Sequence, residues 1–271
     1  MVTDFLSAPF LQNAGRAGKE KSIIRFMCGE EADPTIQQIV CDGAITIKST
    51  KDSAPVSATY PAGTHDAIVV QADENTEVVI AGNVTELYIT KHNDDPDVDD
   101  YEGYMSLASI DVSGCKKLQT LCIAINENVE ALDLSTNTAL QYLYCGSTGL
   151  TALDLSTNTA LQYLYCGSTG LTALDLSTNT ALQHLYCGST GLTALDLSTN
   201  TALQTLYCNN CTSLVEIKYA ATNEDVSTAV AGAITDADAA DGTVYTDSAA
   251  DYYSTIETAA TAKGWTIEQI A

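Results

Sequence analysis

Basic residues are scarce in this 271-residue sequence. No Lys or Arg occurs between Leu118 and Ile217, and the whole chain has 11 basic residues against 35 acidic residues. Proteins that bind nucleic acid neutralise its phosphates with Lys and Arg, and anionic membrane surfaces attract the same side chains. The composition therefore argues against nucleic acid and against an anionic membrane as partners.

Long apolar runs and catalytic motifs are missing as well. No apolar run approaches the roughly 20 residues of a membrane-spanning helix, so we expect no membrane insertion. The start, "MVTDFLSAPFLQNAGRAGKEK", lacks the basic region of a signal peptide, so no signal peptide is visible. The three histidines, His65, His92 and His184, lie in no nucleophile or metal motif, and no glycine-rich phosphate loop occurs. We therefore expect a protein that is not an enzyme and has no cofactor.

What the sequence does contain is a repeat. The stretch "ALDLSTNTALQYLYCGSTG" at 131–149 recurs unchanged at 152–170, and again at 173–191 with His184 as its single change. The period is 21 residues, and leucine-rich periods of 20–29 residues are typical of solenoids. Each unit holds two stretches with alternating apolar residues, "LQYLYC" and "LTALDLS", separated by the turn-forming letters "GSTG" and "STNT". The pattern predicts a leucine-rich repeat solenoid with short parallel β-strands on two faces.

Alternation predicts which side chains form the core. Each coil points five leucines and one cysteine inward, and at roughly 1.5–3 kcal/mol per buried leucine it gains on the order of 10 kcal/mol before entropy is subtracted. We expect buried free thiols, because cysteines of neighbouring coils lie too far apart for an unstrained disulfide. The asparagine column is predicted to bond to the backbone across turns; its members are Asn137, Asn158, Asn179 and Asn200.

Part of the sequence resembles a known family. The pattern "LxxLDLSxNTALxxLYC", and the lead-in "VVIAGNVTELYIT", are similar to leucine-rich repeat proteins of the BspA-like and internalin-like type from bacterial surfaces. The resemblance covers roughly 66–219. It implies adhesion or protein binding at an extracellular or bacterial cell-surface location.

We predict three parts. Residues 1–42 form an N-terminal segment or cap, and residues 43–219 form the solenoid, with regular repeats at about 107–219. Residues 220–271 form a small α/β C-terminal cap, since the period stops and the letters predict strand and helix pairs. Such a cap covers the apolar end of a solenoid. Residues 1–30 are a candidate segment for docking into a larger assembly.

The outward positions of "LQYLYC" form two columns, in which side chains of neighbouring strands lie about 4.8 Å apart. Aromatic rings at this spacing lie against one another and offer contact area to a protein or glycan. The alternative is that tyrosine simply suits exposed strands. The candidate ligand-binding residues are Tyr142, Tyr163, His184 and Thr205 in one column and Tyr144, Tyr165, Tyr186 and Tyr207 in the other.

The other stretch forms an aspartate column. Asp133, Asp154, Asp175 and Asp196 are expected either to be a solvated acidic edge or to bind a cation, for which Ca²⁺ is the candidate. Mutual repulsion is expected to raise the pKa values of these carboxyls.

Two functions remain open. One is an adhesion or ligand-binding module that recognises a protein or glycan through the tyrosine columns. The alternative is a structural or receptor-binding component of a phage particle or similar assembly, located in the virion. Near-identical repeats fit either function, because both use a recognition surface whose length changes with the number of repeats.

Overall fold

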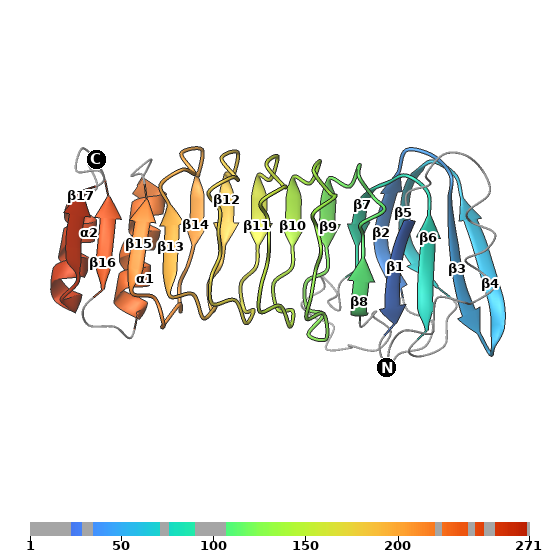
Figure 1. The fold of residues 1–271 in the computed structure, drawn as a ribbon, viewed down its shortest axis with the longest axis horizontal. Helices are drawn as coiled ribbons and strands as arrows, with labels where there is room; N and C mark the ends of the chain where they lie inside the picture. The colour runs from blue at the N-terminus through green and yellow to red at the C-terminus, as the bar shows by residue number, and fades with distance from the viewer. Residues whose placement is uncertain are drawn as a thin grey trace.

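The computed structural model describes residues 23–28, 35–70, 76–89, 107–219, 224–237, 242–246 and 253–269. The molecule is elongated, with antiparallel strands at one end, stacked coils in the middle and two helices at the other end (Figure 1). The predicted docking segment falls mostly on residues 1–22, which lie outside the described residues.

The first part is a pair of antiparallel sheets that face each other across a core of Ile24, Phe26, Ile39 and Leu87, which are at most 1% exposed. The strands are β1 (Ile23–Cys28), β2 (Thr35–Cys41), β3 (Ile45–Lys51), β4 (Ala54–Tyr60), β5 (Gly63–Val69), β6 (Glu77–Ala81) and β7 (Val84–Tyr88).

This part differs from the predicted parallel solenoid beginning at residue 43. The β3 and β4 strands are joined by Asp52 and Ser53, which both have positive φ angles of 52° and 61°. Two left-handed residues make the tight turn of a β-hairpin, so the chain reverses and pairs antiparallel. Alternating apolar residues predict which side chains face inward, but the turn sets the direction of the strand.

Both sheets continue into the repeats. The β1 strand pairs with β8 (Leu107–Asp111), and β7 pairs in parallel with β9 (Thr120–Cys122). The antiparallel part therefore covers the N-terminal end of the stacked coils and satisfies the strand edges there.

The predicted coil of 21 residues is confirmed. Like letters of successive repeats pair in parallel and in register, for example Leu143 with Leu164 and Leu164 with Leu185. The strands of this face are β10 (Tyr142–Tyr144), β11 (Tyr163–Tyr165), β12 (His184–Tyr186) and β14 (Thr205–Tyr207).

The second face has fewer strands than predicted. Only β8, β13 (Ala194–Leu197) and β15 (Glu216–Tyr219) are strands among the described residues of this face in the repeats. In the coils between β8 and β13 the aspartate stretches do not pair as strands. Each aspartate accepts a hydrogen bond from the backbone N–H two residues later, for example Ser156 N–H to Asp154 Oδ1 at 2.9 Å, which turns the chain after the stretch. The same bond forms at Asp111 of β8 and Asp196 of β13, so it does not decide whether a stretch pairs as a strand.

The core of the coils matches the prediction. Leu150, Leu155, Leu161 and Leu164 are at most 1% exposed, and Leu153 is 9% exposed. The inward cysteines of the four coils are buried, with free thiols, at Cys145, Cys166, Cys187 and Cys208. Burial raises the pKa of the Cys166 thiol to about 12, so it stays protonated.

The asparagine column bonds to the backbone of the preceding coil, as predicted. Asn158 donates through Nδ2 to the carbonyls of Leu134 at 3.1 Å and Asn137 at 2.9 Å. Asn179 and Asn200 repeat the pattern one coil further on. These buried amides connect each coil to its neighbour.

The C-terminal part covers the other end. Its elements are α1 (Glu224–Asp236), β16 (Thr243–Thr246), α2 (Tyr253–Lys263) and β17 (Thr266–Gln269), and the strands extend the sheet β13–β15–β16–β17 in parallel. Helix α1 packs beside β14, where no further tyrosine strand follows. Its Val226, Val230, Ala233 and Ile234 are buried, as their helical spacing predicts. Neither helix of the described residues is long and apolar enough to cross a membrane.

Candidate ligand-binding surface

The tyrosine columns lie on the outer side of the sheet β9–β14. In each strand the central leucine is buried and its two neighbours point outward, so Tyr142 and Tyr144 flank the buried Leu143. Tyr142 pairs with Tyr163, and Tyr144 pairs with Tyr165. All eight candidate residues therefore share one face; we call them the tyrosine surface.

The rings do not stack within their columns alone. Tyr144 lies against Tyr163 with ring centroids 4.8 Å apart, and Tyr163 lies against Tyr186 at 5.2 Å. Tyr186 then stacks on Tyr207 at 4.7 Å with an interplanar angle of 13°. The result is one continuous row of four rings that leaves the Tyr144 column at Tyr163 and returns to it at Tyr186.

Tyr165 is outside this row. Its ring is 6.2 Å from Tyr186 and inclined by 58°. A Cβ atom placed on Gly146 would lie 2.0 Å from the Tyr165 ring, so the ring occupies the space that the glycine leaves open. Gly146 therefore leaves room for the Tyr165 ring beside the preceding coil.

Stacking partly buries the phenols. Burial raises the pKa of Tyr144, and burial together with a hydrogen bond to Tyr186 raises the pKa of Tyr163 above its ordinary value of 10.0. These phenols stay neutral in the physiological range and act as hydrogen-bonding groups. His184 lies beside the row, with its ring 5.7 Å from Tyr163.

The surface extends to residues of β7 that the repeat period does not indicate. Glu86 and Tyr88 of β7 pair with Thr120 and Cys122 of β9, which in turn pair with Tyr142 and Tyr144. Tyr88 donates to Glu86 at 3.3 Å, and burial and the Glu86 charge raise the Tyr88 pKa to about 12. The alternation in "VTELYIT" places both residues outward, but only the register across β7 and β9 puts them in the columns.

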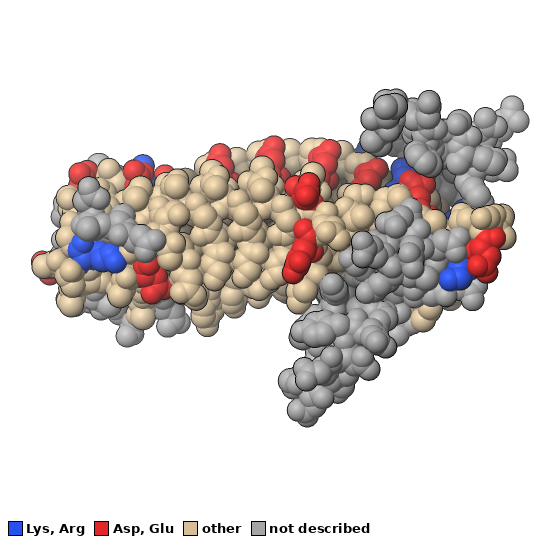
Figure 2. All heavy atoms as spheres, turned by 90° about the horizontal axis from the view of Figure 1, so that it is seen from below, with Lys and Arg blue, Asp and Glu red and all other residues tan. Residues whose placement is uncertain are grey.

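The surface of the repeats has few charges. Figure 2 shows acidic side chains along one long edge of the molecule, and uncharged residues over much of the adjoining surface. No Lys or Arg lies between residues 118 and 217. The charge of the repeats is therefore acidic and lies mainly on the aspartate face.

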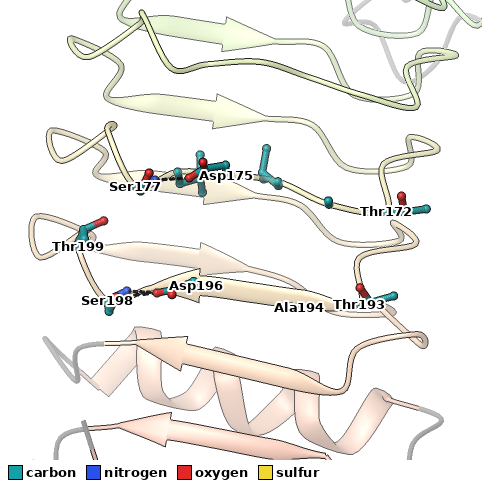
Figure 3. Close-up of a pocket in the computed structure, with 11 residues that line it drawn as sticks. Thr172, Asp175, Ser177, Thr193, Ala194, Asp196, Ser198 and Thr199 are labelled. Carbon is teal, nitrogen blue, oxygen red and sulfur yellow. Dashed lines mark hydrogen bonds between the residues drawn. The ribbon is translucent and has the colours of Figure 1, made fainter. Parts of the chain in front are cut away.

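The aspartate column faces solvent on the other side of the coil. Thr172, Asp175, Thr193, Asp196 and their neighbours line a shallow hollow of about 310 Å³ between two coils (Figure 3). Asp175 and Asp196 lie side by side there, each bonded to the serine two residues later.

The expected rise in carboxyl pKa is wrong. The pKa values of Asp133, Asp154 and Asp175 are lowered, because the hydroxyl and then the backbone N–H of the following serine stabilise the charged form. Repulsion from Asp154 acts on Asp133 and Asp175 in the opposite direction, but it is the smaller effect.

The carboxylates form a line and do not converge. Within the described ranges no three His, Cys, Asp or Glu side chains are grouped so that they could hold a metal ion. A basic side chain lies at each end of the column: the Arg25 guanidinium is 3.8 Å from the Asp111 carboxylate, and Lys218 pairs in register with Asp196.

Comparison with known proteins gives partial likenesses to internalins of Listeria monocytogenes. The functional domain of InlJ, described as including a cysteine ladder, is 30% identical with a TM-score of 0.38; the match covers 42% of this chain and 28% of that one. The internalin inlF is 17% identical with a TM-score of 0.33, and the match covers 68% of this chain and 47% of that one. The chain thus spans less than half the length of either structure. No protein-family model and no curated protein matches the sequence.

Proposed function

We propose that the chain is a non-enzymatic binding module that recognises a protein or glycan partner through the tyrosine surface, at an extracellular or bacterial cell-surface location. The observation that supports this proposal is the continuous row of Tyr144, Tyr163, Tyr186 and Tyr207 on a sheet without Lys or Arg. Tyrosine gives large contact area and hydrogen bonds at a small cost in conformational entropy.

The stacking decides which part of each ring meets the partner. Tyr163 has Tyr144 and Tyr186 as neighbours, and Tyr186 has Tyr163 and Tyr207. The ring faces of Tyr163 and Tyr186 are thus directed along the row, toward neighbouring tyrosines. Their hydroxyls bond to each other and keep further hydrogen-bonding capacity for a partner, because each phenol oxygen can both donate and accept. Recognition by hydrogen bonds to peptide groups or sugar hydroxyls follows, in preference to a sugar ring stacked on a tyrosine face.

This difference makes the hydroxyls testable. Partners are first identified with the full chain on a glycan array and by pull-down from host-cell extract. The affinity of each partner is then measured for Tyr163→Phe with Tyr186→Phe, which keeps the stacked rings and removes two hydroxyls. We expect this double variant to weaken binding by about 1–3 kcal/mol, the value of two hydrogen bonds.

The matched control is Thr172→Ala with Thr193→Ala, which removes two hydroxyls from the exposed aspartate face. A partner of the tyrosine surface retains its affinity for this variant. If the tyrosine variants and Tyr163→Ala with Tyr165→Ala all bind as tightly as the original chain, the tyrosine surface is not the recognition site.

A further inference from the structure

Two tyrosine rings of neighbouring coils lie close together near the C-terminal end of the tyrosine surface. Tyr186 and Tyr207 are direct partners on the parallel strands β12 and β14. Their rings are nearly parallel, at 13°, with centroids 4.7 Å apart. This geometry sets the ring carbons of one phenol against those of the other.

The other aromatic pairs are less well placed. Tyr144 and Tyr163 are inclined by 35°, and Tyr165 and Tyr186 are inclined by 58° at 6.2 Å. Tyr163 and Tyr186 are stacked at 5.2 Å, but their planes differ by 28°. Tyr207 is also 53% exposed, at the end of the row, so a dissolved oxidant reaches it.

We propose that Tyr186 and Tyr207 form an oxidative cross-linking site, at which a dityrosine bond joins the last two coils. Each phenol loses one electron and one proton to give a tyrosyl radical, and the two radicals couple through ring carbons ortho to the hydroxyls. The aromatic hydrogens at those carbons then shift to restore the phenols. The co-reactant is a peroxide reduced by a haem peroxidase: two tyrosines and one hydrogen peroxide give one dityrosine and two waters.

The buried thiols do not compete for the oxidant in solution. Cys187 and Cys208 lie on the inner side of the same strands and are at most 1% exposed. Burial raises the pKa of the Cys187 thiol well above 9.0, so the reactive thiolate is absent. Tyr207, which is 53% exposed, is therefore more accessible to the oxidant than these two thiols.

The bond would act as a staple. Residues 186 and 207 are 21 positions apart, so the link closes a loop of one coil in the unfolded chain. A closed loop lowers the entropy of the unfolded state, and the folded state is stabilised relative to it. The staple lies at the coil next to the α1 cap, where the tyrosine sheet ends.

The test treats the full chain with a peroxidase and hydrogen peroxide. We expect monomeric protein that has lost two hydrogen atoms and shows dityrosine fluorescence. Cleavage before aspartate separates the two tyrosines into 175–195 and 196–224, and the product joins these two peptides. The cross-linked monomer is expected to unfold at higher denaturant concentration than the untreated chain.

Two conservative variants assign the link. Tyr207→Phe removes one phenol and keeps its ring, so the link between 175–195 and 196–224 disappears. Tyr165→Phe removes a phenol that is not stacked on Tyr207, so the link remains. The proposal is wrong if the oxidised chain carries no internal link, if links form only between chains, if Tyr163 is the main partner of Tyr186, or if Tyr207→Phe gives the same product.

Discussion

Removing one amide from the asparagine column tests how the coils are joined. Asn158 is 0% exposed, and its Nδ2 bonds to the carbonyls of Leu134 and Asn137. In Asn158→Ala both bonds are lost. The two carbonyls keep one partner each, because the backbone N–H groups of Asn137 and Leu140 also donate to them at 3.0 Å.

These retained bonds set the magnitude. Two hydrogen bonds at about 0.5–1.5 kcal/mol each give a loss of about 1–3 kcal/mol. A small cavity adds to this loss. The Asn158 Oδ1 has no partner among the described residues, so its removal relieves an unpaired buried acceptor and offsets part of the cost. We expect a net loss of about 2 kcal/mol in the free energy of unfolding.

Urea unfolding followed by far-UV circular dichroism measures this loss. Thr159→Ala is the control, because it changes the exposed neighbouring residue. Asn158→Asp keeps the size and loses the donors, so at neutral pH it buries a charge and is expected to cost more than Asn158→Ala. If Asn158→Ala and Thr159→Ala differ by less than about 0.5 kcal/mol, the amides do not hold the coils together.

Two further predictions concern the turns and the carboxylates. Ser168 has a left-handed φ of 55°, a conformation that Asn tolerates better and that Asn210 adopts at the same place in the last coil. Ser168→Asn is therefore expected to raise the free energy of unfolding, measured with urea, by up to about 1 kcal/mol. The control is Thr157→Asn, at a position without a positive φ, which is expected to give no gain. Asp154 has a lowered pKa in the folded chain, so its stabilising effect is present above the unfolded pKa and is lost as the pH falls through the folded pKa. Asp154→Asn is therefore expected to be less stable than the original chain at neutral pH, and a series of unfolding curves at decreasing pH should show the difference shrink; a constant difference contradicts the pKa shift.

The coil and its core could be predicted from the sequence because they depend on a period. Each coil takes 21 residues, so like residues occupy the same position in successive coils. Alternation along the strand then places Leu143 and Cys145 inward and Tyr142 and Tyr144 outward. Helix α1 was also predictable, since its apolar spacing marks one buried face.

Other features depend on contacts that a period does not encode. The antiparallel strands before residue 89 follow from turns such as Asp52–Ser53, and the lowered pKa of Asp154 follows from the orientation of Ser156. The tyrosine row needed side-chain rotamers as well as register. The column arrangement predicted that the Tyr144 ring would lie against the Tyr165 ring. In the structure the Tyr144 ring lies against Tyr163, and the Tyr165 ring lies next to Gly146.

The crossing of the row explains why one column varies between otherwise identical repeats. An inward leucine is surrounded at every rung, and a buried asparagine binds two carbonyls, so a change at either position costs stability. Because Tyr163 contacts both Tyr144 and Tyr186, the row continues in the second column through Tyr207. No aromatic ring is then needed in the first column beyond Tyr163. His184 and Thr205 occupy those two rungs; the His184 ring lies 5.7 Å from Tyr163, but the stacked row does not pass through either side chain.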